Sequence, residues 1–378
     1  MLLEYLYQSS GKHLLYSRLF STSFATVFSF LVAIIIFKPY INFLRRINFS
    51  SELENSKEHK QPVMPAGILF LFIIFITSLI SVRFNSYVIS ALIIYVFFSC
   101  IGAIDDIAKV INKRRLTRGE ITKEDYQYKA DGISATLRLV LYLVISLAVA
   151  VAAYKYIPNI NGHITIPFLS ITRNFPYLPY WFFIPFMTMA IFVMANGVNF
   201  TDGLDTLSTV PLITCTCFVG VISYISSNNV WSSYLLIPYI PGVEELLPLI
   251  GAVIGTLLAF LWYNAPPSSI IMGDSGAIGL GGLIGILFIF IKAGFYLPIL
   301  GFIFLLEFGS SLLQIGYYKL THKRIFLRAP IHHHFQFLMR KSTVYGNDNN
   351  INSKITWRFH IISIVLFIVG TILFLKVR

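Results

Sequence analysis

Carboxylates bracketed by small residues occur at three separate places in this otherwise very apolar chain. They lie in GAIDDIAK at 102–109, in NGVNFTDGLD at 196–205 and in GDSGAIGLGG at 273–282. Carboxylates that share a poorly hydrated site raise one another's pKa unless a cation compensates their charge. Oxygen ligands favour Mg²⁺, Mn²⁺ or Ca²⁺ over zinc, and Mg²⁺ leaves positions for water and phosphate oxygens. The three segments therefore predict a divalent metal site, most simply for Mg²⁺, that acts on phosphates.

The spacing within the segments assigns their polar residues different tasks. Asp105 and Asp106 are neighbours, about 100° apart on a helix, so they cannot point at one atom in the same way. The second segment holds a series with a spacing of three, in which adjacent members can lie side by side on helical turns: Asn196, Asn199, Asp202 and Asp205. Asp274 opens an apolar span, where a carboxylate has no packing role. For any one carboxylate taken alone, a solvated loop end is the alternative interpretation.

A run of three histidines follows in RAPIHHHF at 328–335. Successive histidines lack the i, i+4 spacing by which a helix puts two ligands on one metal, so the run argues against a zinc site. The imidazoles of His332, His333 and His334 can instead hydrogen-bond a phosphate or stack on a base. A solvated loop with incidental histidines is the alternative.

Membrane helices are the elements that must position these residues. The chain has 378 residues, of which 56% are hydrophobic and 12% charged, a composition that excludes an ordinary soluble domain. Helices are expected because lipid offers no partner to unpaired backbone groups and the apolar runs lack the alternation of barrel strands. We expect an all-α integral membrane protein in which residues 1–378 form a single bundle. Ten spans are predicted, at 19–37, 66–82, 86–104, 133–154, 179–195, 206–225, 246–263, 276–291, 295–315 and 357–377.

The distribution of basic residues predicts the orientation of the bundle. Lysines and arginines concentrate after the first, third and ninth spans, so the positive-inside rule puts the connections after odd-numbered spans in the cytoplasm. The three acidic segments follow the third, fifth and seventh spans and therefore lie on the same side. Both termini are then periplasmic, and the first span is expected to remain as an uncleaved helix. The net charge of +12 is mostly a consequence of this topology. A nucleic-acid partner is disfavoured, because no basic stripe alternates with aromatic residues outside the loops.

Four segments, taken in order, carry a family resemblance. AIDDIAKV, NGVNFTDGLD, IMGDSGAIGLGG and RIFLRAPIHHHF resemble signature segments of the phospho-N-acetylmuramoyl-pentapeptide transferases, in the polyprenyl-phosphate N-acetylhexosamine-1-phosphate transferase superfamily. The resemblance extends from roughly residue 20 to the end of the chain. It implies a ten-helix bacterial inner-membrane enzyme, commonly a homodimer, that requires Mg²⁺. Such an enzyme transfers phospho-MurNAc-pentapeptide from UDP-MurNAc-pentapeptide to undecaprenyl phosphate in the lipid bilayer, giving lipid I and UMP.

The resemblance also implies a role for each candidate residue. Asp274 would be the main Mg²⁺ ligand, Asp105 would deprotonate or orient the lipid phosphate, and Asp106 would support it or the metal. Asp202 would be the third catalytic aspartate and, with Asn199 and Asp205, would hold the metal-pyrophosphate assembly or the uridine. The substrate-binding residues would be Lys109 for a phosphate, Asn196, Asn199 and Asp205 beside Asp202, and His332, His333 and His334 for the nucleotide. Direct attack by a lipid phosphate oxygen on the sugar-linked phosphorus is the preferred mechanism. A covalent intermediate on Asp106 or Asp202 stays open.

One segment and three single positions depart from the family pattern. PVMPAG at 62–67 is an altered form of the expected segment before the second span, and Arg138 stands where a lysine is expected. Gln336 replaces a glutamate after the histidines, and Thr206 replaces a glycine. Arginine at position 138 keeps the charge but changes the donor geometry.

The sequence is also compatible with two other functions. One is a sister transferase that loads a sugar phosphate from UDP-GlcNAc or a related donor onto the same lipid. The other is a secondary transporter, since polar breaks between apolar spans also build ion and substrate sites. A transporter predicts carboxylates near the bilayer midplane and paired repeats, whereas here the carboxylates lie at span ends.

Overall fold

The computed structural model describes residues 2–11, 13–47, 49, 62–120, 134–157, 159–169, 176–341 and 348–375. Within these ranges the regular secondary structure is helical, with two isolated bridges and no strand. The prediction of an all-α protein is therefore confirmed. Residue 133 of the fourth predicted span and residues 376–377 of the tenth lie outside the described residues.

Eight described helices are long and apolar enough to cross a membrane. They are α2 (Arg18–Arg46), α4 (Ser86–Thr117), α6 (Ala135–Tyr156), α7 (Tyr180–Thr201), α8 (Thr209–Ser226), α10 (Leu246–Asn264), α11 (Gly273–Phe290) and α15 (Asp348–Leu375). They correspond to eight of the ten predicted spans, and the other two predicted spans have a different form.

The second and ninth predicted spans are not simple crossing helices. The second is α3 (Gly67–Ser81), whose 15 residues are fewer than the roughly 20 that span a bilayer. The ninth is broken: η3 (Gly294–Tyr296) and α12 (Leu297–Leu300) meet α13 (Phe302–Thr321) at an angle of 83°. Gly301 stands at the break, and glycine is a common site of sharp helix kinks. Hydropathy does not reveal this bend, because both halves of the span are apolar.

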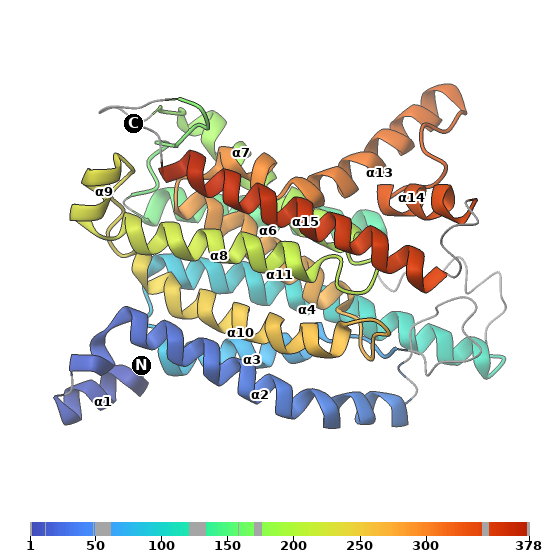
Figure 1. The fold of residues 1–378 in the computed structure, drawn as a ribbon, viewed down its shortest axis with the longest axis horizontal. Coiled ribbons are helices and arrows are strands. Elements are labelled where there is room, and N and C mark those ends of the chain that lie inside the picture. Colours follow the sequence, from blue (N-terminus) through green and yellow to red (C-terminus); the bar gives the residue numbers. More distant parts are fainter. Residues whose placement is uncertain are drawn as a thin grey trace.

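α11 forms the core of the bundle. All of its residues except Asp274 are buried, and it packs against α3, α4, α7 and α8. Figure 1 shows it in the middle of the bundle. The outer helices expose large apolar side chains, among them Val27, Phe72 and Val144, as expected for helices that face lipid. The only polar side chain with access to solvent on α11 is thus the predicted metal ligand at its first turn.

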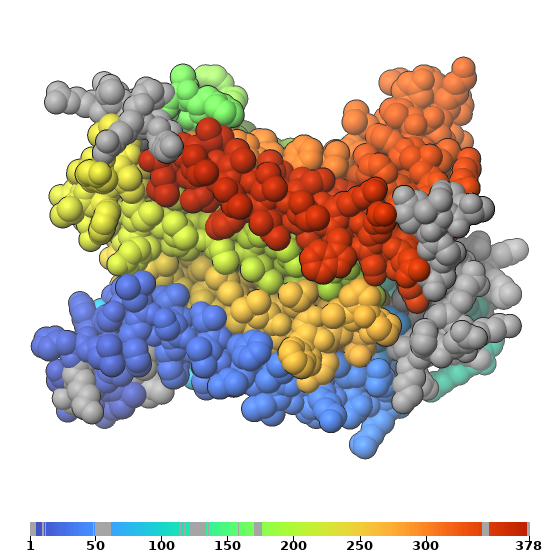
Figure 2. Space-filling model, in the orientation of Figure 1, coloured from blue at the N-terminus to red at the C-terminus, as the bar shows by residue number. Residues whose placement is uncertain are grey.

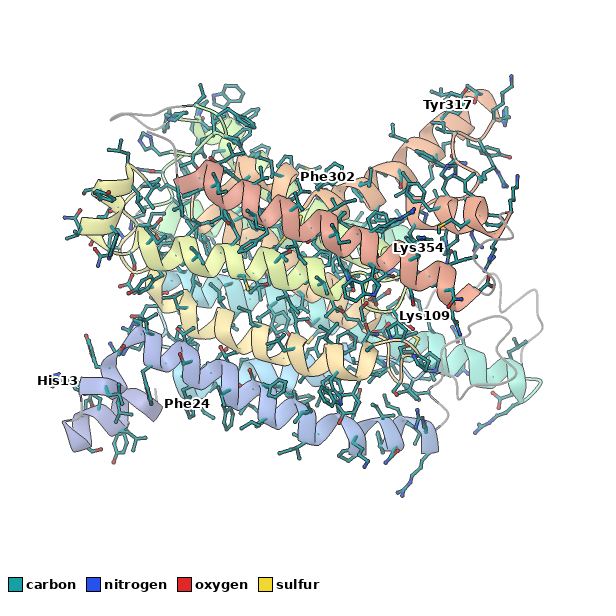
Figure 3. All side chains as sticks on the ribbon, viewed as in Figure 1. His13, Phe24, Lys109, Phe302, Tyr317 and Lys354 are labelled. Carbon is teal, nitrogen blue, oxygen red and sulfur yellow. The ribbon has the colours of Figure 1, made fainter. Side chains whose placement is uncertain are left out.

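The two ends of the bundle differ. One end carries α1 (Leu2–Ser10), η1 (His13–Tyr16), α9 (Asn229–Leu235) and η2 (Val243–Glu245), and α15 finishes there. At the other end α13 and α14 (Ile331–Arg340) project from the bundle, as Figures 1 and 2 show. Lys109 lies at this second end, opposite His13 (Figure 3). The acidic segments therefore gather at the end from which α13 and α14 project.

Candidate active site

The three predicted acidic segments meet at the N-terminus of α11. The backbone N–H groups of Asp274 and Ser275 donate to the two carboxylate oxygens of Asp106, at 3.1 and 3.0 Å. The N–H of Gly273 donates to Asp202 Oδ2 at 3.3 Å. The first N–H groups of a helix lack partners within the helix and carry a partial positive charge, so they favour carboxylates. α11 thus links a carboxylate from α4 with one from the end of α7.

Gly273 allows this close approach. Its φ of +77° is in the left-handed region, and an added Cβ would lie 2.7 Å from Pro65 Cβ and 2.9 Å from Asp106 Oδ2. Any larger residue would be strained and would push Asp106 away from the helix N-terminus. Pro65 belongs to the altered segment 62–67, whose Val63 forms an isolated parallel bridge with Ile270. The altered segment therefore still lies against the loop that precedes Asp274.

Two cations complete the cluster. Lys109 Nζ lies 2.8 Å from Asp105 Oδ2 and 2.9 Å from Asp274 Oδ2. Arg138 Nη1 pairs with the same two oxygens, at 2.9 Å from that of Asp274. The carboxylate of Asp105 is fully buried, while the side chain of Lys109 keeps 30% of its surface exposed. Asp105 therefore holds two cations at the surface of the site, where an anionic substrate can reach them.

The charge balance of the cluster fits a divalent cation. Among the described residues, Lys109 and Arg138 are the cations that pair with this group of four carboxylates, Asp105, Asp106, Asp202 and Asp274, so the described part of the ionised cluster carries more negative than positive charge. In the described part of the chain, no three His, Cys, Asp or Glu side chains converge into a ready metal cage. An open set of oxygen ligands suits Mg²⁺, which keeps several waters and phosphate oxygens in its coordination sphere.

The carboxyl of Asp202 lies just beyond the last residue of α7 and has a perturbed pKa. Its Oδ1 accepts a hydrogen bond from Ser208 Oγ at 2.8 Å. Desolvation raises the pKa of Asp202 to about 7, and the nearby carboxylates of Asp274 and Asp106 act in the same direction. Asp205 lies further along the same loop and accepts from the N–H of Ser268 at 3.3 Å. The two aspartates therefore have different surroundings, although they are only three residues apart.

The loop that carries Asp202 and Asp205 is fixed by buried partners. Thr206 donates its N–H to Asn264 Oδ1 at 2.8 Å, and its carbonyl oxygen lies 2.9 Å from His360 Nε2. Its φ of +64° is in the left-handed region, which explains why glycine is the expected residue there. Asn264 also donates to the carbonyl of Ile270 at 2.9 Å, and so joins this loop to the one before α11.

The two predicted asparagines have unequal access to the site. Asn196 is buried, and its amide donates to the carbonyl of Phe192 in its own helix at 2.8 Å. Asn199 lies in the last turn of α7 and is partly exposed, and its carbonyl accepts from the N–H of Asp202. Asn199 is therefore placed next to the carboxylates, whereas Asn196 lies one turn deeper in the bundle.

The histidine run joins the acidic segments through His332. An added Cβ at Gly203 would lie 2.5 Å from His332 Nε2, so the imidazole lies directly against the loop of Asp202 and Asp205. His332 Nδ1 is 2.9 Å from Glu307 Oε2 on α13, and both side chains are buried. Glu307 was not among the predicted site residues. Its signal was present in the sequence, since it is the only acidic residue in the span 295–315 and an intramembrane carboxylate usually marks function.

The other two histidines have different partners. His333 Nδ1 is 2.6 Å from Gln336 Oε1, and Gln336 Nε2 donates to Asn352 Oδ1 on α15 at 2.7 Å. His334 Nδ1 accepts from the N–H of Leu327 at 3.2 Å, so its proton is on Nε2. Desolvation lowers the pKa of His333 to about 4, and the positive charge of Arg328 acts in the same direction. His333 is therefore neutral at physiological pH.

We expect Gln336→Glu to give His333 a charge change near neutral pH. A carboxylate at the position of Gln336 Oε1 would stabilise the imidazolium, so the pKa of His333 should rise from about 4 to at least its ordinary value of about 6.5. Nitrogen NMR shifts of the labelled histidines, followed from pH 5 to 8, measure this titration. Gln336→Met is the control, because it removes the acceptor without adding charge. A His333 titration in Gln336→Glu that matches that of the unaltered protein would contradict the assignment.

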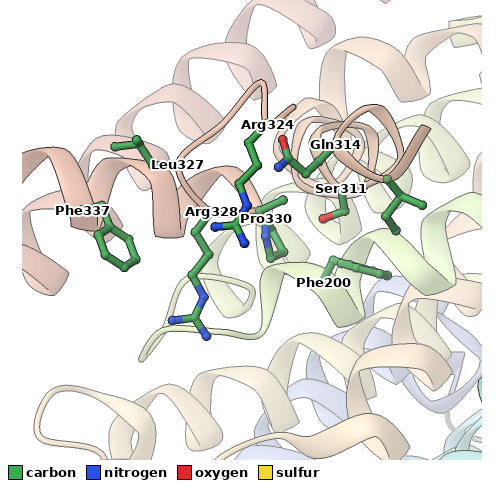
Figure 4. A pocket seen from close by; sticks show the side chains of 10 residues that line it. Phe200, Ser311, Gln314, Arg324, Leu327, Arg328, Pro330 and Phe337 are labelled. Atoms are coloured by element: carbon green, nitrogen blue, oxygen red, sulfur yellow. The ribbon is translucent and has the colours of Figure 1, made fainter. Parts of the chain in front are cut away.

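A cavity of about 460 Å³ lies beside the histidines, between α13, the connection 322–330 and α14 (Figure 4). It is lined by Phe200, Ser311, Gln314, Ile315, Arg324, Leu327, Arg328, Ala329, Pro330 and Phe337. The sequence did not predict it, because its walls come from a bent helix and a connection whose path depends on that bend.

The sequence is similar to one family model and to several curated proteins, which all describe glycosyl or sugar-phosphate transferases. The family model of glycosyl transferase family 4 matches residues 88–292, a range that contains all four clustered aspartates. A phospho-N-acetylmuramoyl-pentapeptide-transferase of Nitratiruptor sp. is 37% identical over 326 residues, which is 86% of this chain and 83% of the relative. The protein of the same name from Nautilia profundicola is 33% identical over 382 residues and covers 100% of both chains. That from Sulfurimonas denitrificans is 38% identical over 320 residues, 84% of this chain and 82% of the relative.

Proposed function

The chain belongs to glycosyl transferase family 4 and, within it, to the phospho-N-acetylmuramoyl-pentapeptide transferases, and on this basis we propose its reaction. It transfers phospho-MurNAc-pentapeptide from UDP-MurNAc-pentapeptide to undecaprenyl phosphate, which forms lipid I and releases UMP. The observation that carries this proposal is the carboxylate cluster at the N-terminus of α11, which in the described residues has more carboxylates than paired cations and lies beside the partly exposed Lys109 and Arg138.

The residues at the cluster fit a resident Mg²⁺. Asp274, with Asp106 and Asp202 beside it, would hold the ion, which offsets negative charge on the pyrophosphate and on the departing UMP. Lys109 and Arg138 bind the phosphate of the lipid acceptor, because Asp105 keeps both cations at the rim of the site. The carboxylate of Asp105 is fully buried, and its Oδ2 holds both cations. We therefore assign Asp105 the orienting role rather than that of a base.

Direct attack by the lipid phosphate is favoured over a covalent intermediate on Asp106. Both carboxylate oxygens of Asp106 accept backbone hydrogen bonds from α11. An oxygen that attacks phosphorus would lose electron density and so weaken its backbone hydrogen bond, one of the two that anchor Asp106. An already ionised phosphate oxygen of the acceptor needs no such rearrangement.

His332 supports the loop of Asp202 and Asp205. Asn199, Asp205 and the other two histidines contact the nucleotide part of the donor.

We place the enzyme in the bacterial inner membrane, with the site facing the cytoplasm and the termini facing the periplasm. Basic residues support this orientation, since Arg45 and Arg46 end α2 and Lys319 lies in the last turn of α13. A homodimer is part of the proposal on the basis of the family resemblance. The transporter alternative lacks support, because Asp105 and Asp274 pair with Lys109, which lies toward one end of the bundle rather than at its midplane (Figure 3).

A donor comparison tests the proposal against the sister transferase that uses UDP-GlcNAc. The purified protein in detergent is given undecaprenyl phosphate, Mg²⁺ and one donor at a time, and both UMP and the lipid product are measured. We expect turnover with UDP-MurNAc-pentapeptide, none above background with UDP-GlcNAc, and loss of turnover when EDTA removes the metal. Turnover with UDP-GlcNAc alone would refute the proposed donor.

A further inference from the structure

The cavity beside the histidines adjoins the active site. Phe200, on its α7 wall, lies two residues before Asp202, and Pro330, at its edge, lies two residues before His332. A donor whose pyrophosphate lies at the carboxylate cluster therefore has this cavity as a neighbouring space. Its remaining walls are apolar at Ile315, Leu327 and Phe337.

The polar groups of the cavity are mainly hydrogen-bond donors. Arg324 and Arg328 reach into it from the connection 322–330, with Phe337 on one side and Gln314 and Ser311 on the other (Figure 4). Neither guanidinium is paired with a carboxylate of the described residues, and no acidic residue is part of the cavity wall. Gln314 Oε1 already accepts from the N–H groups of Ile325 and Phe326, at 3.1 and 2.9 Å, so only its NH₂ group is left for a ligand.

A cavity with two free guanidinium groups and a free amide donor is suited to carboxylates and carbonyl oxygens. The planar fork of arginine binds a carboxylate through two parallel hydrogen bonds. The uridine and the sugar of the donor carry no carboxylate, whereas a peptide has carbonyl groups throughout and at least one carboxylate at its C-terminus. An extended pentapeptide spans roughly 17 Å, long enough to pass beyond the histidines.

We propose that this cavity is a carboxylate-binding subsite for the peptide part of the donor, with Arg324 and Arg328 as its anion ligands and Gln314 Nε2 as a donor to a peptide carbonyl. This inference rests on the proposed function and extends it, because it gives the enzyme a way to distinguish a sugar phosphate that carries an acidic peptide from one that does not. UDP-GlcNAc would leave both guanidinium groups unpaired.

The first test is the kinetics of Arg324→Gln and Arg328→Gln. Each variant is expected to raise the KM for UDP-MurNAc-pentapeptide about tenfold, the change typical of losing one charged hydrogen bond, while kcat changes less than about threefold. The KM for undecaprenyl phosphate and the inhibition constant of UMP should not change, since neither ligand contains the peptide. Lys323→Gln is the matched control, because it removes the same charge from the same connection at a position outside the cavity wall.

A second test uses the donor instead of the protein. A donor whose peptide carboxylates are converted to amides should bind the unaltered enzyme about tenfold more weakly, and the arginine variants should lose little further affinity for it. This non-additivity identifies the peptide carboxylate as the group that the arginines bind.

Several outcomes would overturn the subsite. A raised KM for undecaprenyl phosphate would assign the arginines to a lipid phosphate, and a raised inhibition constant for UMP would assign them to the nucleotide. An unchanged KM for the donor in both variants, or equal losses for the natural and amidated donors, would also overturn it. Turnover of UDP-MurNAc-pentapeptide by the unaltered enzyme, measured first, tests the proposed function separately.

Discussion

Asp274→Asn is expected to reduce Mg²⁺-dependent UMP release by at least about a thousandfold, equivalent to about 4 kcal/mol of transition-state stabilisation. Asparagine has the shape of aspartate but lacks the charge, so the site would lose its main metal ligand with little change in packing. The same substitution deprives Lys109 and Arg138 of the carboxylate of Asp274. Their position would then depend more strongly on Asp105, and acceptor binding should weaken as well.

The fold should survive this substitution. Asp274 belongs to a cluster with excess negative charge, and removing one carboxylate relieves repulsion there as well as breaking ion pairs. We expect the thermal midpoint in detergent to stay within about 5 °C of that of the unaltered protein. Asp348→Asn is the control, because this carboxylate is 60% exposed and pairs with Arg340 away from the cluster. Near-normal turnover by Asp274→Asn would remove the metal site from the proposal.

The acidic site was predictable because its parts obey local rules. Membrane helices must begin and end near the bilayer surface, so carboxylates placed at span ends on one side are brought to one face of the bundle. Asp105, Asp106, Asp202 and Asp274 follow this rule, and the structure joins all four within one hydrogen-bonded cluster. Their arrangement around the N-terminus of α11 could not be predicted, because the sequence does not specify which backbone N–H groups donate hydrogen bonds to a given carboxylate.

Features that depend on tertiary packing escaped prediction. The 83° bend at Gly301 leaves the hydropathy of the span unchanged, yet it directs α13 away from the bundle and places Glu307 beside His332. Arg138 was noted only as a departure from a family pattern, and its contact with two aspartates depends on how α6 packs beside α4. The cavity of Arg324 and Arg328 depends on the same bend, so it could not be inferred from the sequence either.

Glu307→Gln is expected to show that the bend at Gly301 serves to position His332. Glu307 Oε2 lies 2.9 Å from His332 Nδ1 and also accepts from the N–H of His332, so one buried carboxylate sets both the ring and the backbone of this residue. Glutamine preserves the volume but loses the charge, and its amide can present NH₂ instead of oxygen to Nδ1. We expect kcat to fall about 10- to 100-fold with little change in the donor KM, since hydrogen bonds to charged groups contribute roughly 1.5–3 kcal/mol.

Two further measurements distinguish positioning by Glu307 from a general structural effect. The carboxylate of Glu307 accepts the proton that His332 carries on Nδ1, and Nε2 then lies against Gly203. In Glu307→Gln this preference for the Nδ1 tautomer should weaken, and the nitrogen NMR shifts of the His332 ring should change accordingly. Because Glu307 acts through His332, the variant Glu307→Gln/His332→Asn should be no slower than His332→Asn alone. Losses that multiply in the double variant would show that the two residues act independently. In that case the bend at Gly301 would serve the packing of α13 rather than the alignment of the histidine with the catalytic loop.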